Sequence, residues 1–396
     1  TYWYHSHSGL QEQQGHYGPL VIDPAGAAPA EYDRDYILLL SEFTPLHPHR
    51  IMDRLRKGEG YFNYQQTAWA DDYPLSAADR RMWAEMRMPA TDIADVTGST
   101  YTYLANGRGP KEGTEFAFNP GERIRLRVIN GAAQTFFNLR IPGLPMTVIA
   151  ADGQNVRGVE VDELQIGTAE IYDVIVEPRA EAYTIVAESM DRSGMALATL
   201  ASRPDARAPI PPPRKPPLLD MGDMGMNHGD GGHGGNSMEG MKMRDTLLLP
   251  PDVKVGPGID MVSMAPVDKL GDPGLGLREM EHRVLNYRML SALEPNADTR
   301  EPSRLLELHL TGNMERYMWS FDGRMYSAVS DDPIRFAWNE RVRVKLVNNT
   351  MMAHPIHLHG MFFELVNGED PAHQPRKNIV IVQPGASAQF DLTANE

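Results

Sequence analysis

The chain has 396 residues, with 35 glycines, 31 prolines, no cysteine and a formal net charge of −15. This length allows two to three domains, each able to bury its own core, and the many short alternating runs favour an all-β architecture. The charge argues against nucleic acid or an acidic membrane surface as a partner, and no apolar run is long enough to cross a bilayer. A disulfide framework is excluded.

Two histidines stand near the beginning of the chain, in the aromatic, strand-like sequence TYWYHSHS. His5 and His7 are two residues apart, so on a strand both side chains point to the same face. Imidazole suits copper, zinc, iron and nickel alike, so the pair predicts a metal site without selecting the metal. We expect residues 1–30 to form the end of one β domain.

A second β domain is expected over residues 31–203. It begins with a buried-strand pattern at residues 35–40, DYILLL. His47 and His49 have the spacing of a metal-binding pair, but each follows or precedes a proline. We expect a loop there that does not bind metal.

The segment 76–88 is the best helix candidate in this domain. Ser76 is placed to cap it, and a proline follows its last residue. Its Met82, Trp83 and Met86 could form a soft patch for cuprous ion or substrate. We favour the alternative that these side chains pack the helix against a sheet.

An internal repeat supports more than one copy of the same β domain. Residues 122–130 (ERIRLRVIN) match residues 340–348 (ERVRVKLVN) almost position for position. If the match continues without a gap, three apolar residues of the first copy correspond to three histidines of the second: Phe136, Leu139 and Ile141 to His354, His357 and His359. The fold then does not need histidine at these places, so the second copy uses it for chemistry.

Residues 204–280 have a different composition. Seven prolines between positions 204 and 217 predict an extended linker, and the following stretch is rich in Gly, Met, His and Asp. Thioethers favour cuprous copper, and beside the histidine motifs we favour copper recruitment over a flexible insertion that binds nothing tightly. The candidate residues are Met221, Met224, Met226, His228, His233, Met238, Met241 and Met243.

The third domain, residues 281–396, carries the strongest metal signal. Three histidines lie within HPIHLHG, after an alternating strand at residues 341–347. His357 and His359, in an extended run, share one face and can bind one ion or two neighbouring ions. His354 is offset by an odd number and precedes a proline, so we expect it to serve a different metal.

Other histidines of this domain are isolated. We expect His282, His309 and His373 to be surface or satisfied polar residues. Asp322 and Gly323 predict a hairpin turn.

The motifs together resemble those of a known family. WYHSHS with the following QGHYGPLVIDP resembles the second copper motif of multicopper oxidases, and HPIHLHG resembles the third. Residues 151–154, 163–176 and 319–323 resemble the bacterial copper-resistance branch. The resemblance implies tandem cupredoxin-like Greek-key β-sandwich domains, three in the parent protein. It also implies a blue-copper ligand, His354, and four ligands of a trinuclear copper cluster: His5, His7, His357 and His359.

The sequence departs from the family pattern in two places. It contains neither the first His-x-His-Gly motif nor the final His-Cys-His motif, and blue copper requires a thiolate. We therefore expect these 396 residues to be the middle of a longer protein, with the first and last domains truncated.

The function that the resemblance implies is that of a laccase-like oxidoreductase in periplasmic copper resistance, monomeric and not membrane-spanning. It would couple one-electron oxidation of cuprous ion or a phenol to the reduction of dioxygen to water. Two alternatives remain open: a copper-sequestering protein without turnover, and a cupin-like zinc or non-haem iron protein. The second lacks a carboxylate at a fitting spacing beside either histidine pair.

We predict that this chain, expressed as written and loaded with copper, shows no intense blue colour. A blue-copper absorption band arises from a thiolate ligand, and the sequence has none. Visible absorption spectroscopy checks this, and a strong thiolate-to-copper band would contradict it.

Overall fold

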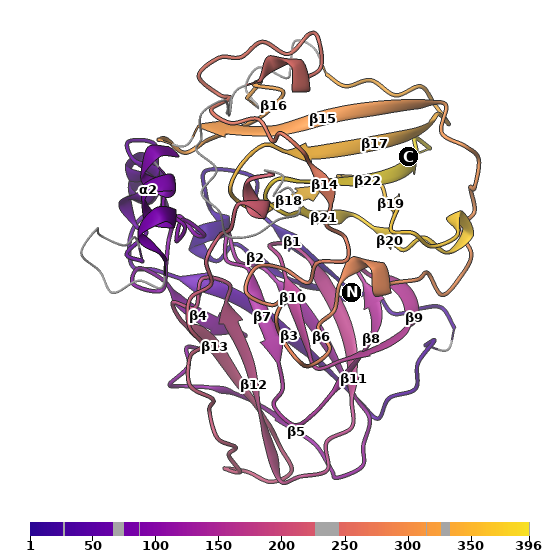
Figure 1. Ribbon diagram of the computed structural model, residues 1–396. Coiled ribbons are helices and arrows are strands. Elements are labelled where there is room, and N and C mark those ends of the chain that lie inside the picture. The colour runs from indigo at the N-terminus through magenta and orange to yellow at the C-terminus, as the bar shows by residue number, and fades with distance from the viewer. Residues whose placement is uncertain are drawn as a thin grey trace.

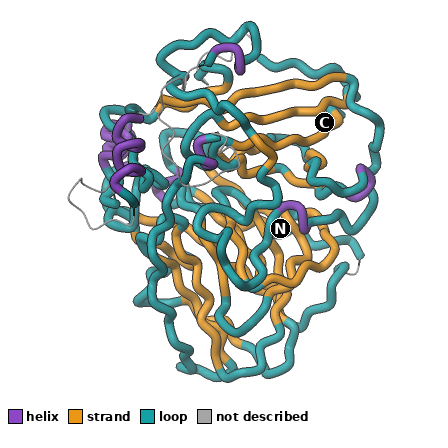
Figure 2. Tube along the Cα trace, viewed as in Figure 1, coloured by secondary structure: helices purple, strands orange, loops and turns teal. Residues whose placement is uncertain are grey.

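β-Strands make up almost all of the regular structure. The computed structural model describes residues 1–26, 28–65, 75–86, 88–225, 245–313, 315–325 and 333–395. Figures 1 and 2 show one group of strands in the lower half of the view and a second group in the upper half, with few helices. The all-β prediction is confirmed.

Strands between residues 34 and 201 form the central sandwich, which within the described residues consists of two sheets. Leu38, Leu126 and Val148 of one sheet share a core with Leu139 and Ile185 of the other. In spatial order the first sheet is β4 (Thr102–Ala105), β3 (Arg34–Phe43), β6 (Ile124–Asn130), β11 (Ile171–Val176), β8 (Met146–Ala151) and β9 (Gln154–Val161). The second is β10 (Glu163–Ile166), β7 (Phe137–Arg140), β12 (Ala182–Ser189), β13 (Met195–Ala201) and β5 (Thr114–Ala117).

Strands between residues 267 and 393 form the C-terminal sheet. Its order is β16 (Met318–Phe321), β15 (Arg304–Asn313), β17 (Arg341–Asn348), β22 (Ala386–Thr393), β19 (Phe363–Leu365) and β20 (Arg376–Lys377), with β14 (Val267–Asp268) also pairing with β22. A separate antiparallel pair, β18 (His354–His357) and β21 (Ile379–Val382), packs on this sheet. Val380 and Val382 of that pair share a core with Leu346 and Phe390.

A hairpin at the N-terminal end contacts both groups of strands. It consists of β1 (Tyr2–His5) and β2 (Tyr17–Leu20), which pair in antiparallel fashion. The Thr1 hydroxyl donates to Asp173 of the central sandwich at 2.9 Å, and the Tyr2 ring lies 6.5 Å from the Phe362 ring. The hairpin is therefore held between the two groups, as its place in Figure 1 shows.

Two helices lie together at one side of the molecule (Figure 1): α1 (Pro48–Leu55) and α2 (Ala77–Met86). Ser76 accepts a hydrogen bond from the Asp79 backbone N–H at 3.1 Å, so the predicted cap of α2 is confirmed. Trp83 of α2 is buried in an apolar cluster that Met82 and Met86 flank, which supports the packing interpretation. Short 3₁₀ turns are η1 (Glu12–Gln14), η2 (Glu59–Tyr61), η3 (Gly222–Met224), η4 (Thr246–Leu248), η5 (Tyr287–Met289) and η7 (Pro371–His373).

The loop predicted around His47 and His49 is wrong in part, because α1 begins inside it. His47 caps the helix by accepting a hydrogen bond from the His49 backbone N–H at 3.3 Å. Pro48 occupies the first helical position, where its missing N–H and fixed φ angle are favourable. The proline therefore starts a helix here.

The predicted repeat is confirmed by the strand pairing. β6 lies between β3, to which it is parallel, and the antiparallel β11. β17 lies in the same way between the parallel β15 and the antiparallel β22. The predicted turn at Asp322 and Gly323, with φ angles of 51° and 75°, follows β16 as Asn106 and Gly107 follow β4.

The ungapped continuation of the repeat is wrong by one residue. Phe137 pairs with Ile166 in the central sandwich, and His354 pairs with Val382 in the second copy. The side chain of Asn130 donates to the Ile166 carbonyl at 3.0 Å, and Asn348 donates to the Val382 carbonyl at the same distance. The counterparts of His354 and His357 are thus Phe137 and Arg140, because the connecting turn is one residue shorter in the second copy.

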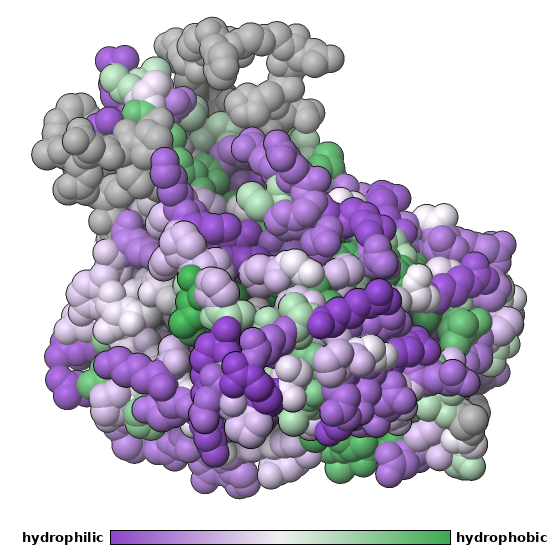
Figure 3. Space-filling view, turned by 90° about the horizontal axis from the view of Figure 1, so that it is seen from below, coloured by the Kyte–Doolittle hydropathy of each residue, from purple (hydrophilic) through white to green (hydrophobic). Residues whose placement is uncertain are grey.

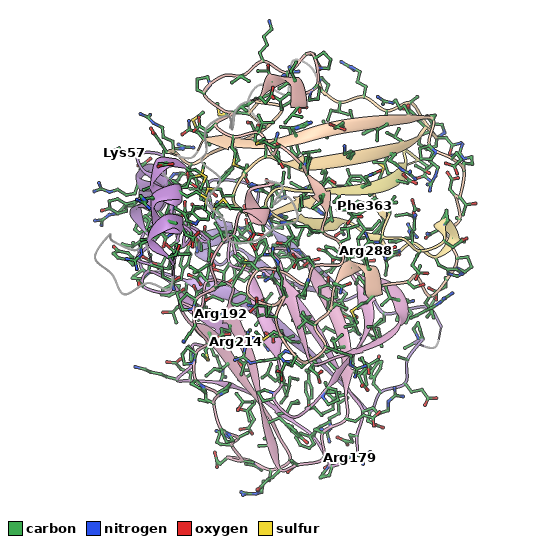
Figure 4. The ribbon with its side chains drawn as sticks, viewed as in Figure 1. Lys57, Arg179, Arg192, Arg214, Arg288 and Phe363 are labelled. Carbon is green, nitrogen blue, oxygen red and sulfur yellow. The ribbon has the colours of Figure 1, made fainter. Side chains whose placement is uncertain are left out.

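Arg214 ties the proline-rich segment to buried acids of the central sandwich. Residues 206–220 contain no helix or strand. Arg214 forms ion pairs at 2.6 Å with both Glu163 and Glu188, which are fully buried, and Arg192 pairs with Glu188 at 3.0 Å. Figure 4 shows Arg192 and Arg214 beside each other.

The outer surface is mostly polar on the side seen in Figure 3. Hydrophilic side chains cover most of this face, and apolar residues gather only in small patches. Among the described residues, no helix is both long and apolar enough to cross a membrane.

A buried ion cluster joins the C-terminal sheet to the central sandwich. Lys377 has no exposed surface, and its Nζ lies 3.0 Å from Asp152 and 3.2 Å from Glu170. Tyr287 donates a hydrogen bond to Glu170 at 2.7 Å and accepts one from the Ile381 backbone N–H at 3.0 Å. The three side chains are thus shielded from bulk solvent, and each depends on the others for its partners.

We predict that Lys377→Met destabilises the chain by about 3–5 kcal/mol, because two buried carboxylates lose their cation. Chemical denaturation measures this. Arg203→Met is the control, since Arg203 and its partner Glu181 are 65% and 56% exposed, and we expect a change below about 1 kcal/mol. Equal effects of the two substitutions would contradict the assigned role of Lys377.

Candidate metal centre

Four predicted histidines come together from the two ends of the chain. The His5 and His7 rings lie 4.5 Å apart, His7 lies 5.0 Å from His359, and His359 lies 4.6 Å from His357. The Trp3 ring stacks on His5 at 4.3 Å. More than 340 residues of sequence separate the two pairs, so the tertiary fold creates this four-histidine group.

Each pair straddles the end of a strand. β1 ends at His5 and β18 ends at His357. The prediction that an extended run carries both His357 and His359 is therefore wrong, because the backbone bends after His357 and reaches a left-handed residue, Gly360, with φ of 79°. The bend still brings His359 back against His357.

The hydrogen bonds of the ring nitrogens leave lone pairs for a ligand. His357 Nδ1 lies 2.8 Å from the Asn378 carbonyl, to which only a protonated nitrogen can donate, so Nε2 carries the lone pair. His5 Nδ1 is buried without a hydrogen-bond partner, and Glu12 lies 3.8 Å away. Burial and the neighbouring histidines lower the pKa of His5 and of His359. Neutral imidazole, the form that binds metals, is favoured.

The donor set fits copper in part. Imidazole nitrogens suit copper, and the orphaned His5 nitrogen is an unmet polar group. Within the described residues, no three His, Asp or Glu side chains are arranged to hold a single ion. The four histidines thus provide two adjacent pairs, while the thiolate of a blue-copper site is not among these 396 residues.

His354 lies apart from the four-histidine group, three residues before His357 on β18. Its Nε2 is 2.7 Å from the Thr350 hydroxyl, and the Trp319 ring packs against it at 4.7 Å in an edge-on arrangement. Burial lowers its pKa to about 4. His354 also lines a cavity of about 180 Å³.

The wall of that cavity is mixed in chemistry. Met190 and Met352 contribute thioethers, Trp319 and Phe136 contribute aromatic rings, and Asp95 contributes a carboxylate. The cavity opens between the central sandwich and the C-terminal sheet, since the two groups of strands supply different parts of its lining. It can therefore admit either a soft cation or a small aromatic molecule beside His354.

Sequence reasoning did not find a pair of neighbouring buried acids, one of which, Asp95, lines the cavity. Glu59 and Asp95 are 3% and 5% exposed, and both oxygens of Glu59 and one of Asp95 have no hydrogen-bond partner. Burial, with smaller contributions from neighbouring carboxylates, raises the pKa of Glu59 to about 10, and burial and Asp92 raise that of Asp95 to about 8. Isolated acids carry no spacing signal in a sequence.

Only two of the candidate copper-recruiting residues, Met221 and Met224, lie within the part of the chain that the structure describes. Met221 is buried in the apolar cluster around Trp83, and Met224 lies in η3. The other candidates lie outside the described residues: Met226, His228, His233, Met238, Met241 and Met243. Copper recruitment by this segment stays a prediction.

The isolated histidines are satisfied, as predicted. His309 is buried between Glu307 and Asn349, which lie 3.0 and 2.8 Å from its ring nitrogens. His282 contacts Glu163 at 2.8 Å, and His373 contacts the Ala292 carbonyl at 3.2 Å.

Comparison with known proteins gives the family. Profiles described as multicopper oxidase match residues 1–27, 70–204 and 299–396. Copper resistance protein A of Escherichia coli is 44% identical over all of this chain and 73% of its own length. The copper resistance protein A homolog of Pseudomonas syringae pv. tomato is also 44% identical, over all of this chain and 72% of its own length.

The histidine sites and these matches define a copper-dependent oxidoreductase. The chain belongs to the multicopper oxidase family. Membership implies copper as the cofactor, in a blue-copper centre and a trinuclear cluster. Membership in this family therefore rules out the alternative hypothesis of a cupin-like zinc or non-haem iron protein.

Solved structures agree on the fold. Fet3p, a multicopper oxidase that functions in iron import, matches with a TM-score of 0.61 and 15% identity, covering 99% of this chain and 66% of that one. The laccase from Botrytis aclada matches with a TM-score of 0.59 and 19% identity, covering 99% and 64%. The cupredoxin-like fold is thus shown, and this chain spans about two thirds of the length of these structures.

We predict that Glu59→Gln becomes increasingly stabilising as pH rises. The Glu59 pKa rises from 4.5 to about 10 on folding. The neutral acid therefore contributes stability that is complete below about pH 4.5 and is lost as pH rises towards 10. Glutamine cannot ionise, so from pH 5 to pH 9 we expect the variant to gain roughly 2 kcal/mol or more over the natural chain.

Thermal unfolding of both proteins across this pH range checks the prediction. Glu294→Gln, at an exposed position, is the matched control and is expected to show no such trend. A constant difference between Glu59→Gln and the natural chain at every pH would contradict the assigned protonation state.

Proposed function

We propose that this chain forms the copper-binding part of an oxidase that removes single electrons from cuprous ion or a phenol and reduces dioxygen to water. The observation that carries the proposal is the four-histidine group, assembled from two distant segments, with His354 beside a cavity on the same strand. We further propose a monomeric protein that acts in the periplasm in copper resistance. The names of the two 44% identical relatives support that role.

The residues divide into two sites under this proposal. His5, His7, His357 and His359 would hold copper of the trinuclear cluster, and His354 would be a ligand of the blue copper. When bound, copper supplies the one-electron chemistry. The protein supplies ligand geometry, and the two sites are close along the chain because His354 and His357 lie three positions apart on one strand.

The chain's own residues account for substrate access. Met190 and Met352 offer the thioethers that favour cuprous copper, while Trp319 and Phe136 offer a surface suited to a phenol. The buried acids at Glu59 and Asp95 are neutral at low pH. Ionisation of Asp95 near pH 8 would add negative charge beside the cavity, which favours a cation over a phenol.

The proposed oxidase activity applies to a form of the protein that includes a thiolate ligand for the blue copper. No cysteine is present in these residues, so a blue-copper centre at His354 needs a thiolate that they do not contain. Copper binding by the four-histidine group does not need it. We propose that residues 1–30, 31–203, 204–280 and 281–396 are, in order, the end of one cupredoxin domain, a second, a linker with a copper-recruiting insertion, and part of a third.

Copper sequestration without turnover is the second candidate. It is favoured by the methionines between residues 221 and 243, whose thioethers are soft ligands for cuprous copper. Oxygen consumption with cuprous ion or a phenol, measured on a form of the protein that includes the thiolate, distinguishes an oxidase from a store.

We predict that His7→Ala and His359→Ala each weaken copper binding by at least about tenfold, because loss of a ligand costs no less than loss of its supporting hydrogen bond. Copper per chain, measured by elemental analysis after equilibrium dialysis, gives the result. His373→Ala is the control, since its ring is engaged with the Ala292 carbonyl. Unchanged copper in the His7 and His359 variants would sink the proposed site.

A further inference from the structure

The turn that precedes His354 can be compared with an equivalent turn of the central sandwich, which is one residue longer. The turn follows β6 in one copy and β17 in the other, and each strand ends in asparagine. The Asn130 side-chain oxygen accepts from the Ala132 N–H at 3.0 Å, and that of Asn348 accepts from the Thr350 N–H at 2.9 Å. The two turns are therefore built by the same hydrogen bond.

The amide nitrogens of the two asparagines also have equivalent partners. Asn130 donates to the Thr135 carbonyl at 2.8 Å, and Asn348 donates to the Met352 carbonyl at 2.7 Å. Each also donates across to the strand that pairs with the next one, to Ile166 or Val382. Since carbonyls surround these nitrogens, the orientation of both amides is fixed.

The two turns differ in the residues that lie at and near His354. Ala132 corresponds to Thr350, and Phe137 corresponds to His354. The turn forms in the central sandwich with no hydroxyl at this position. The Thr350 hydroxyl occurs in the copy that carries His354, where it also contacts the Met352 carbonyl at 3.2 Å and accepts from the Met352 N–H at 3.3 Å.

The proton positions follow from the distances. Thr350 Oγ1 lies 2.8 Å from the Asn348 side-chain oxygen and 3.2 Å from the Met352 carbonyl oxygen. Both oxygens can only accept, so the hydroxyl donates its proton to one of them, and Asn348 makes the shorter contact. The hydroxyl has one proton, which leaves only lone pairs for His354 Nε2 at 2.7 Å. Nε2 must then carry the proton and donate. The lone pair of the neutral imidazole is on Nδ1.

We propose that Thr350 is a positioning residue that holds His354 as the Nε2-protonated tautomer and so presents Nδ1 as its metal-binding atom. The inference rests on the proposed role of His354 as a copper ligand. His357, on the same strand, is held in the opposite way, because its Nδ1 donates to the Asn378 carbonyl. The two histidines thus offer different ring nitrogens to a metal.

The experiment uses the metal-free chain with ¹⁵N-labelled histidine. Ring nitrogen chemical shifts report which nitrogen carries the proton, and His354→Gln assigns the signals. We expect a single Nε2-protonated His354 in the natural chain and in Thr350→Ser. Thr350→Val and Thr350→Ala should shift the tautomer equilibrium by about tenfold towards the other form, which is the loss expected for one hydrogen bond.

Two features keep the test decisive. Thr350→Ala reproduces the residue at the equivalent position of the central sandwich, so the turn is expected to form. Thr184→Val is the matched control, since this buried threonine donates one hydrogen bond, to the Ala208 carbonyl at 3.1 Å, and should leave the His354 shifts unchanged. Unchanged shifts in folded Thr350→Val and Thr350→Ala would overturn the proposal.

A copper titration of the same samples separates this inference from the proposed function. Loss of the His354 signals on adding Cu²⁺ is expected if His354 is a ligand. Signals that persist in the natural chain, while the tautomer still depends on the Thr350 hydroxyl, would contradict the ligand role and leave the positioning role intact.

Discussion

The buried contact of Lys377 with Asp152 and Glu170 is the constraint on which the candidate site depends. The two carboxylates belong to the central sandwich, and the lysine ends a strand of the C-terminal sheet. The next residue, Asn378, has its N–H bound by Asp152 at 3.2 Å, and its carbonyl receives His357 Nδ1 at 2.8 Å. The orientation of a candidate ligand in one sheet is therefore set by charges in the other.

The lysine ammonium is stabilised in its buried position by its aromatic neighbours as well as by the two carboxylates. The ammonium lies 5.0 Å from the centre of the Tyr172 ring and 5.4 Å from that of Tyr287, close enough for favourable cation–π interaction. Burial lowers the lysine pKa, but the two carboxylates outweigh it and raise the pKa overall. The ammonium is thus charged at neutral pH, and a buried network of charge-assisted contacts holds its geometry tightly.

The two copies of the repeat show which residues serve the common fold and which are particular to the copy with the histidines. Asn130 and Asn348 make equivalent hydrogen bonds, so they belong to the architecture. Phe137 and His354 occupy equivalent places on paired strands, so the histidine is an addition to that architecture. The family match agrees with this division, because the cupredoxin-like sandwich is shared by structures with as little as 15% identity.

The sequence by itself determined the strand-rich architecture and the repeat, and it predicted the five candidate histidines, because alternation, near-identical segments and His-x-His spacing are local patterns. It could not place His359 on its bend or detect the one-residue gap before His354, since turn geometry depends on hydrogen bonds such as those of Asn348. Only the tertiary structure brought His7 against His359 and buried Lys377 and Glu59. These contacts join residues far apart in the chain, and their energies come from burial and charge, which no local pattern encodes.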